Sequence, residues 1–185
     1  TIPNNWTGKF IFTAGSIRYA RGLEDLIFAI KQFKIKYNDS VRLVIAGEAE
    51  PRMFKYLEKL KNWLSNNNLS SSVCWVNSLN KEEMAWCYKN CKLFVMTSRV
   101  ESFGMIAGEA MSNGCLCLSS LSPCLPEIFK DSAIYYENKD FIDLADKIND
   151  AINLNDKIRE KMSIRAINRA KQFSWDVCVN KTVAF

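Results

Sequence analysis

The feature that most constrains the fold of this chain is the alternation of short apolar runs with segments whose apolar residues recur at helical spacing. Runs that are apolar at nearly every position are typical of strands buried on both faces of a parallel sheet. Such runs occupy residues 9–14, 41–47, 73–76, 93–96, 115–119 and 133–136. Helices are predicted from Leu23 and over about residues 51–65, 81–88, 105–113, 122–128, 141–153 and 156–173. The alternation predicts an α/β fold with a doubly wound parallel sheet.

The composition is that of a globular protein, and the 185 residues suffice for a single well-buried domain. The net charge of +5 is compatible with a polyphosphate ligand, and we expect no nucleic-acid partner. No apolar run approaches the roughly 18–20 residues of a membrane span. The first six residues, Thr1 to Trp6, do not form a signal peptide and look like a cut into a longer chain.

The seven cysteines lie mostly within apolar runs, which is typical of reduced core thiols in a cytoplasmic protein. Cys87 and Cys91 are four positions apart, but the chain has no histidine to complete a usual zinc set, so we expect no metal site. The absence of histidine also excludes Ser-His-Asp and Cys-His catalysis. Any chemistry must therefore use carboxylates, lysine, tyrosine or the ligand itself.

The stretch 99–114 has the strongest functional signal. It follows the buried run 93–96 with a polar loop, and a helix then continues to Asn113 and Gly114. Glu101 lies in the loop, and Glu109 is predicted in the second turn of the helix. The free N–H groups of a helix N-terminus suit a phosphate. Two carboxylates so placed could bind hydroxyls on two different parts of one ligand.

A second loop of this kind follows the first strand. It begins at Gly15 and carries Arg18 and Arg21 beside the start of the next helix. Arginines at such a position suit a phosphate clamp. The loops after Ala14, Ala46 and Met96 all follow strands, so they are predicted at the carboxyl edge of the sheet, where ligands bind in open α/β folds.

Glu101 and Glu109, with seven residues between them, resemble the paired glutamates of retaining GT-B glycosyltransferases of group 1, a family 4-like group. Phe103, Gly104, Ala110 and Met111 match the usual surroundings of that signature. The first loop is similar to the family's Gly-Arg and Lys-Gly pattern, except that Ser16 replaces the first basic residue and Arg21 the lysine. The resemblance covers residues 10–176, ending in a segment similar to the family's end segment.

The resemblance implies a Rossmann-like fold, the carboxyl-terminal lobe of a GT-B enzyme. Residues 1–185 would form a single sugar-nucleotide-binding domain whose amino-terminal acceptor lobe lies outside this chain. Glu109 would bind the ribose, and Glu101, with Arg21, would act in catalysis at the donor sugar. The diphosphate and base contacts would come from Gly15, Ser16, Arg21, Phe103, Gly104, Met105 and Asn77. Asn77 stands where the family has a glycine, and asparagine tolerates the positive φ that glycine supplies.

The expected activity is transfer of a sugar from a nucleotide diphosphate sugar to a glycan or lipid-linked acceptor, without a metal or other cofactor. The chain alone is expected to be inactive. Three alternatives stay open: a non-catalytic nucleotide-binding or regulatory module, a GT-B sugar-nucleotide epimerase, and a flavodoxin-like domain. The stripe of Lys157, Lys161, Arg165 and Arg169 is interpreted as a solvated helix face, with contact to a membrane surface as the alternative.

Overall fold

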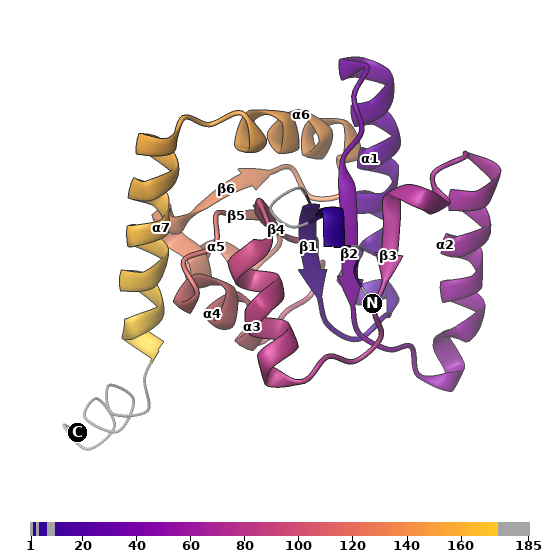
Figure 1. Cartoon of the computed structure of the whole chain (residues 1–185). Helices are drawn as coiled ribbons and strands as arrows, with labels where there is room; N and C mark the ends of the chain where they lie inside the picture. The colour runs from indigo at the N-terminus through magenta and orange to yellow at the C-terminus, as the bar shows by residue number, and fades with distance from the viewer. Residues whose placement is uncertain (1, 3, 7–9, 174–185) are drawn as a thin grey trace.

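The computed structural model describes residues 2, 4–6 and 10–173. It contains one sheet in which the six strands run in the order β3-β2-β1-β4-β5-β6, and every pair is parallel (Figure 1). The strands are β1 (Phe10–Ala14), β2 (Arg42–Ala46), β3 (Val73–Trp75), β4 (Leu93–Met96), β5 (Cys117–Ser120) and β6 (Ala133–Tyr136). The predicted doubly wound α/β fold is therefore confirmed. The predicted end segment after Phe173, together with Cys178, lies outside the described residues.

The helices cover both faces of the sheet (Figure 1). One face carries α1 (Leu23–Tyr37), α2 (Phe54–Asn66) and α6 (Phe141–Ile152), and the other carries α3 (Lys81–Asn90), α4 (Met105–Ser112), α5 (Leu125–Phe129) and α7 (Asp156–Ala170). Short 3-10 turns occupy Asn4–Trp6, Tyr19–Arg21, Pro51–Met53, Ser70–Ser72, Lys130–Ser132 and Lys171–Phe173. Because both faces are covered, most strand residues are buried, and β4 and β5 are buried at every position, which explains the nearly continuous apolar sequences.

The alternation of side chains along β1 divides the core into two layers. Ile11 packs under α1 and α6, whereas Phe10 and Phe12 pack on the opposite face with α3 and α4. The β1–β4 register pairs Phe12 with Phe94, whose rings meet edge to face at 6.1 Å. Since the strand order reverses between β1 and β4, a crevice is expected at their carboxyl ends.

Several predicted boundaries shift by one to three residues, and two of these shifts have a cause in the local backbone. The fifth strand begins at Cys117 rather than Cys115, because Cys115 N–H bonds back to the carbonyl of Ala110 at the end of α4. The predicted helix at residue 122 begins instead at Leu125. Cys124 immediately before it has φ 76° and ψ −35°, which no helix can adopt. Cys115 and Cys117 nevertheless belong to the same layer of the core.

The basic stripe of α7 is not solvated along its whole length, because Arg169 at its carboxyl end contacts other elements of the protein. Arg169 donates from Nε to the carbonyl of Ile128 at 2.8 Å and from Nη2 to that of Glu127 at 2.7 Å. Its guanidinium also lies 4.4 Å from the centre of the Phe173 ring. Arg169 therefore links α5 to α7.

Among the described residues, no helix combines the length and the apolar character that crossing a membrane requires.

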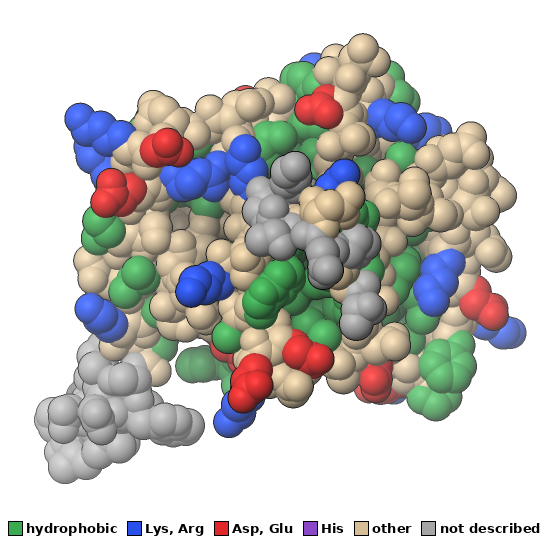
Figure 2. Space-filling model, viewed as in Figure 1, with side chains coloured by type: hydrophobic (Ala, Val, Ile, Leu, Met, Phe, Trp, Pro, Cys, Tyr) green, Lys and Arg blue, Asp and Glu red, His purple; other side chains and the backbone are tan. Residues whose placement is uncertain are grey.

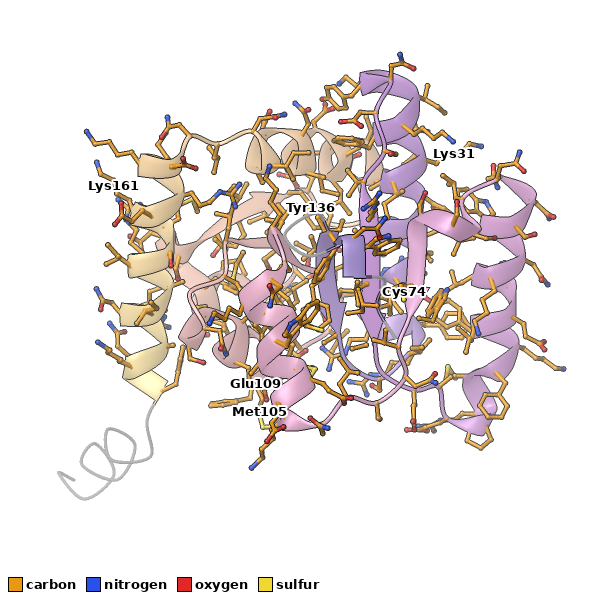
Figure 3. All side chains as sticks on the ribbon, viewed as in Figure 1. Lys31, Cys74, Met105, Glu109, Tyr136 and Lys161 are labelled. Carbon is orange, nitrogen blue, oxygen red and sulfur yellow. The ribbon has the colours of Figure 1, made fainter. Side chains whose placement is uncertain are left out.

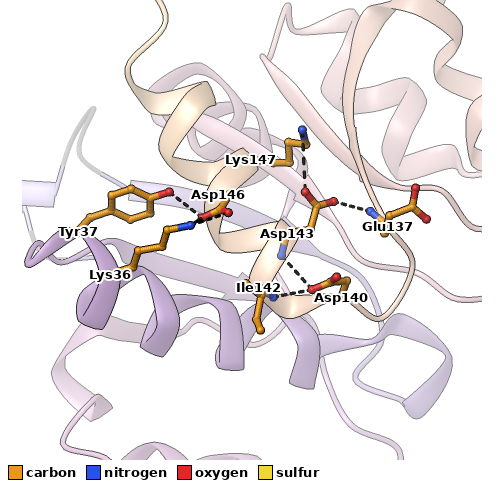
Figure 4. A network of polar contacts seen from close by, with 8 residues as sticks. All are labelled: Lys36, Tyr37, Glu137, Asp140, Ile142, Asp143, Asp146 and Lys147. Atoms are coloured by element: carbon orange, nitrogen blue, oxygen red, sulfur yellow. Dashed lines mark hydrogen bonds and ion pairs between the residues drawn. The ribbon is translucent and has the colours of Figure 1, made fainter.

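Polar contacts join α1 to α6 and cap the start of α6 (Figure 4). Lys36 Nζ and Tyr37 Oη both donate to Asp146, at 2.6 and 2.7 Å. Asp140 caps α6 by accepting from the N–H groups of Ile142 and Asp143.

Figure 2 shows that basic and acidic side chains are interspersed over the viewed face, so the positive charge is not concentrated in one patch there.

Cys124 offers a test of the backbone conformation before α5. A side chain at positive φ costs about 1–2 kcal/mol, which glycine avoids. The glycine variant Cys124→Gly is therefore expected to exceed Cys124→Ala in free energy of unfolding by about 1 kcal/mol, after allowance for glycine's greater entropy when unfolded. Both variants lack the exposed thiol, so urea unfolding isolates the backbone effect. If the alanine variant is as stable as the glycine variant, the backbone at position 124 is not strained.

Candidate functional site

The loops that follow β1, β2 and β4 meet at the carboxyl edge of the sheet, where two hollows open on either side of α4. The edge hollow, of about 300 Å³, is lined by Ala14, Gly15, Ser16, Ala46, Gly47, Glu48, Ser78, Leu79, Met84 and Ile106. The α4–α7 groove, of about 700 Å³, is lined by Phe103, Gly104, Met105, Gly108, Glu109, Ser112, Ile128, Ile167, Ala170, Lys171 and Phe173. The amino-terminal half of α4 therefore borders both.

Arg21 and Glu101, which are 80 positions apart in the chain, form a direct ion pair at the start of α1 and α4. Arg21 Nη1 donates to Glu101 Oε2 at 2.7 Å and to Ser98 Oγ at 3.2 Å. The two side chains are only 15% and 10% exposed. Burial lowers the pKa of the Arg21 guanidinium, and the Glu101 carboxylate opposes that shift. The Nε atom of Arg21 is buried with no partner among the described residues, so the guanidinium keeps unused donor capacity.

Gly15 and Gly47 allow the loops to approach each other closely. A Cβ on Gly47 would lie 1.9 Å from the carbonyl oxygen of Gly15, so no other residue fits there. Gly15 has φ 130°, and a Cβ on it would lie 3.0 Å from Cζ and Nε of Arg21. The absence of a side chain at both positions thus brings Arg21 against the backbone of the first loop. Ser16 lies beside them, exposed, on the rim of the edge hollow.

The loop after β4 is held against the first loop by contacts that the sequence did not reveal. Thr97 Oγ1 donates to the carbonyl of Arg21 at 2.7 Å, and the N–H of Arg99 donates to the carbonyl of Ala20 at 2.8 Å. Arg99 forms ion pairs with Glu24 at 2.8 Å and Asp25 at 2.9 Å. Burial raises the pKa of Asp25, and Arg99 opposes the rise. These contacts fix the backbone on either side of the Arg21–Glu101 pair.

The amino-terminus of α4 presents unpaired backbone donors to the site. Gly104 precedes the helix with φ 68°, and the first helical hydrogen bond runs from the N–H of Gly108 to the carbonyl of Gly104. The N–H groups of Met105, Ile106 and Ala107 therefore lie ahead of the intrahelical ladder, where they and the helix dipole favour an anion. The side chains of Phe103 and Met105 are 63% and 72% exposed, so it is the backbone at these positions that the fold offers to a ligand.

Glu109 lies in the second turn of α4, as predicted, on the border of the α4–α7 groove. Figure 3 shows Glu109 and Met105 close to each other toward the lower edge of the view. Glu109 Oε2 accepts a hydrogen bond of 3.0 Å from Tyr88 Oη on α3. Sequence reasoning missed Tyr88, because a tyrosine on an amphipathic helix is usually a core residue. Nothing in the spacing of Tyr88 and Glu109 indicates that they meet.

Asn77 follows β3 with φ 54°, the positive value expected at a position where a glycine would be typical. Its carbonyl accepts the N–H of Gly47 at 2.7 Å, which places the turn after β3 beside the edge hollow. The fold thus brings Gly15, Ser16 and Arg21 near Glu101. Gly104 immediately precedes α4, and Met105 and Glu109 lie on that helix.

Within the described part of the chain, no three Cys, Asp or Glu side chains are grouped closely enough to hold a metal ion.

These features define the class of protein: a Rossmann-like α/β domain whose carboxyl edge combines a buried arginine, a helix N-terminus and two carboxylates. The model of the family "Glycosyl transferases group 1" matches residues 2–169. The chain belongs to this family.

The similarity extends to named relatives and solved structures. The uncharacterized glycosyltransferase MJ1178 of Methanocaldococcus jannaschii is 29% identical over 180 residues, which cover 96% of this chain and 48% of the relative. The serotype-specific mannosyltransferase WbdA of Escherichia coli is 25% identical over 168 residues, covering 90% of this chain and 20% of the relative. This chain thus spans about half, or less, of the length of these relatives.

Two solved structures share the fold. The carboxyl-terminal domain of the group 1 glycosyl transferase LpcC from Francisella tularensis has a TM-score of 0.76 at 24% identity and covers 90% of this chain and 87% of that one. Anabaena Alr3699/HepE, solved in complex with UDP and glucose, has a TM-score of 0.81 at 20% identity, covering 96% of this chain and 47% of that one. At these identities the likeness concerns the fold alone.

Proposed function

We propose that this chain is the donor-binding lobe of a two-lobed retaining glycosyltransferase, and that it binds a nucleotide diphosphate sugar at the carboxyl edge of its sheet. The observation that carries the proposal is the Arg21–Glu101 ion pair, which lies beside Gly104 at the amino-terminus of α4 and so brings a cation near free backbone donors. An anionic diphosphate beside a sugar hydroxyl suits that combination. The two-lobed organisation is supported by the coverage of the relatives.

In this proposal the diphosphate lies between Arg21 and the N–H groups of Met105 to Ala107, and the donor sugar lies against Glu101. The base lies in the edge hollow, whose lining side chains Leu79, Met84 and Ile106 suit a flat apolar ring, and the ribose lies over α4. Asn77 contributes its backbone beside the base. Glu109 binds the ribose hydroxyls. That the relative HepE was solved with UDP supports a nucleoside diphosphate as the ligand class.

The proposed reaction breaks the bond between the anomeric carbon and the diphosphate oxygen. The acceptor hydroxyl attacks that carbon on the same face, and its proton passes to the leaving phosphate, so configuration is retained. Arg21 and the α4 amides stabilise the negative charge that develops on the diphosphate. No step uses a histidine or a metal, in keeping with a chain that has no histidine. The acceptor, a glycan or a lipid-linked sugar, is held by the other lobe.

Calorimetric titration of the chain with UDP, GDP and ADP, each compared with its monophosphate, tests the proposal. The second phosphate adds at least one charge-assisted hydrogen bond, so at least one diphosphate is expected to bind about tenfold more tightly than its monophosphate. The chain alone is expected to transfer no sugar to an added glycan acceptor. Equal affinity for mono- and diphosphates would contradict the phosphate site, and robust transfer by these residues alone would contradict the two-lobed organisation.

The replacement of the family's first basic residue by Ser16 favours one alternative, a nucleotide-binding module that does not catalyse transfer. Ser16 is exposed and supplies no charge to a diphosphate, while the nearby Arg18 is exposed as well. The two functions share the same ligand and differ in chemistry. Hydrolysis or transfer of a nucleotide sugar by the chain joined to its acceptor lobe would support the enzyme, and tight binding with no turnover would support the module.

A further inference from the structure

Tyr88 is a buried tyrosine whose hydroxyl lies at the candidate site. It projects from α3 toward the sheet and is 4% exposed. Its ring meets those of Phe12 at 5.4 Å and Phe94 at 5.8 Å, both edge to face. Packing against β1 and β4 therefore fixes the ring, and a fixed ring holds its hydroxyl oxygen at one place relative to the sheet.

The hydroxyl of Tyr88 contacts one oxygen of the Glu109 carboxylate and leaves the other oxygen available to a ligand. Tyr88 Oη lies 3.0 Å from Glu109 Oε2, whereas Glu109 itself is exposed at the border of the α4–α7 groove. Burial and the neighbouring carboxylate raise the pKa of Tyr88 far above its ordinary value, so the hydroxyl stays a proton donor at all physiological pH values. A surface carboxylate on a helix otherwise samples several rotamers, and this contact selects one of them.

We infer that Tyr88 is a positioning residue, which orients the Glu109 carboxylate so that its second oxygen can accept from the hydroxyls of a ligand's ribose. The inference rests on the proposed function, since it assigns the ribose to Glu109. The competing explanation is that Glu109 merely satisfies a buried tyrosine hydroxyl, which needs a partner in any case. The two explanations differ in what happens to nucleotide binding when only the hydroxyl is removed.

The variant Tyr88→Phe keeps the ring and removes the hydroxyl. It is expected to weaken the binding of UDP or GDP, whichever the wild type binds more tightly, by about three- to tenfold. The 2′,3′-dideoxy form of the same nucleotide should bind equally well to wild type and variant. In a Glu109→Gln background, Tyr88→Phe should cause no further loss, because its effect passes through the carboxylate.

The matched control is Tyr135→Phe on β6, which removes a tyrosine hydroxyl that donates to the carbonyl of Lys130 at 2.6 Å. It is expected to leave nucleotide binding unchanged. A readout without nucleotide is the ¹³C signal of the Glu109 carboxyl group, which should move in Tyr88→Phe and stay in place in Tyr135→Phe. An equal loss of ribo- and dideoxynucleotide binding, or an unmoved Glu109 signal, would overturn the positioning role.

The outcomes separate this inference from the proposed function. If the wild type prefers the ribonucleotide through Glu109 and Tyr88→Phe binds it normally, only the positioning role falls. If the wild type binds none of UDP, GDP and ADP, the proposed function falls, and the positioning role falls with it.

Discussion

Replacing Arg21 by alanine is expected to raise the dissociation constant for the tightest-binding nucleoside diphosphate by about 10- to 150-fold, since a charge-assisted hydrogen bond contributes about 1.5–3 kcal/mol. The effect should lie toward the upper end for two reasons. Ser16 supplies no second cation. In the wild type the Glu101 carboxylate lies 2.7 Å from Arg21 Nη1, and without Arg21 this carboxylate would repel the phosphates. Isothermal titration calorimetry measures the loss, and urea unfolding checks that the fold is intact.

Two variants control for this result. Arg21→Lys keeps the charge and introduces the residue typical of the family, so it should bind within a few-fold of wild type. Arg18→Ala removes an exposed arginine of the same loop and should have a smaller effect. Added EDTA should change neither variant nor wild type, because no metal is expected. Loss of binding in Arg18→Ala with normal binding in Arg21→Ala would show that the wrong arginine has been assigned to the phosphate.

Replacing Glu109 by glutamine should weaken the binding of a ribonucleoside diphosphate by at least about tenfold, because a carboxylate that accepts from two hydroxyls loses its charge. The 2′,3′-dideoxy analogue should bind equally well to wild type and variant, since it lacks those hydroxyls. Calorimetric titration with both ligands measures the difference. It separates a contact with the ribose from a general effect on the site.

The matched control for the second prediction is Glu160→Gln, which removes an exposed carboxylate from α7. It should alter the binding of neither ligand. Equal losses for the ribo- and dideoxynucleotide in Glu109→Gln would mean that Glu109 does not contact the ribose, and the assignment of the two glutamates to sugar and ribose would have to be revised.

The fold could be predicted because its determinants are local. Six apolar runs separated by helical periods leave few topologies, and the connection of parallel strands by helices places every strand end at one edge. The positions of Gly15, Arg21, Glu101 and Gly104 at that edge follow from the strand ends alone. The positive φ of Asn77 was predicted in the same way, from the conformational tolerance of asparagine.

The contacts between site residues could not be predicted, because they join distant segments through side chains. Arg99 and Asp25 are 74 positions apart, and neither has a sequence neighbour that indicates the other. Tyr88 and Glu109 lie on two different helices, and their contact depends on how both pack on the sheet. Cys124 was missed as a strained residue for a different reason, since its positive φ occurs in a residue that seldom adopts it.

The most direct test of the central claim, that a nucleoside diphosphate binds at the carboxyl edge of the sheet, is to map its binding by ¹⁵N-resolved NMR. Titration with UDP and GDP should move the amide signals of Gly15, Ser16, Gly104 and Met105, and leave those of α6, such as Ile148, in place. Shifts confined to α6 and α7, or no shift anywhere at millimolar nucleotide, would contradict the account.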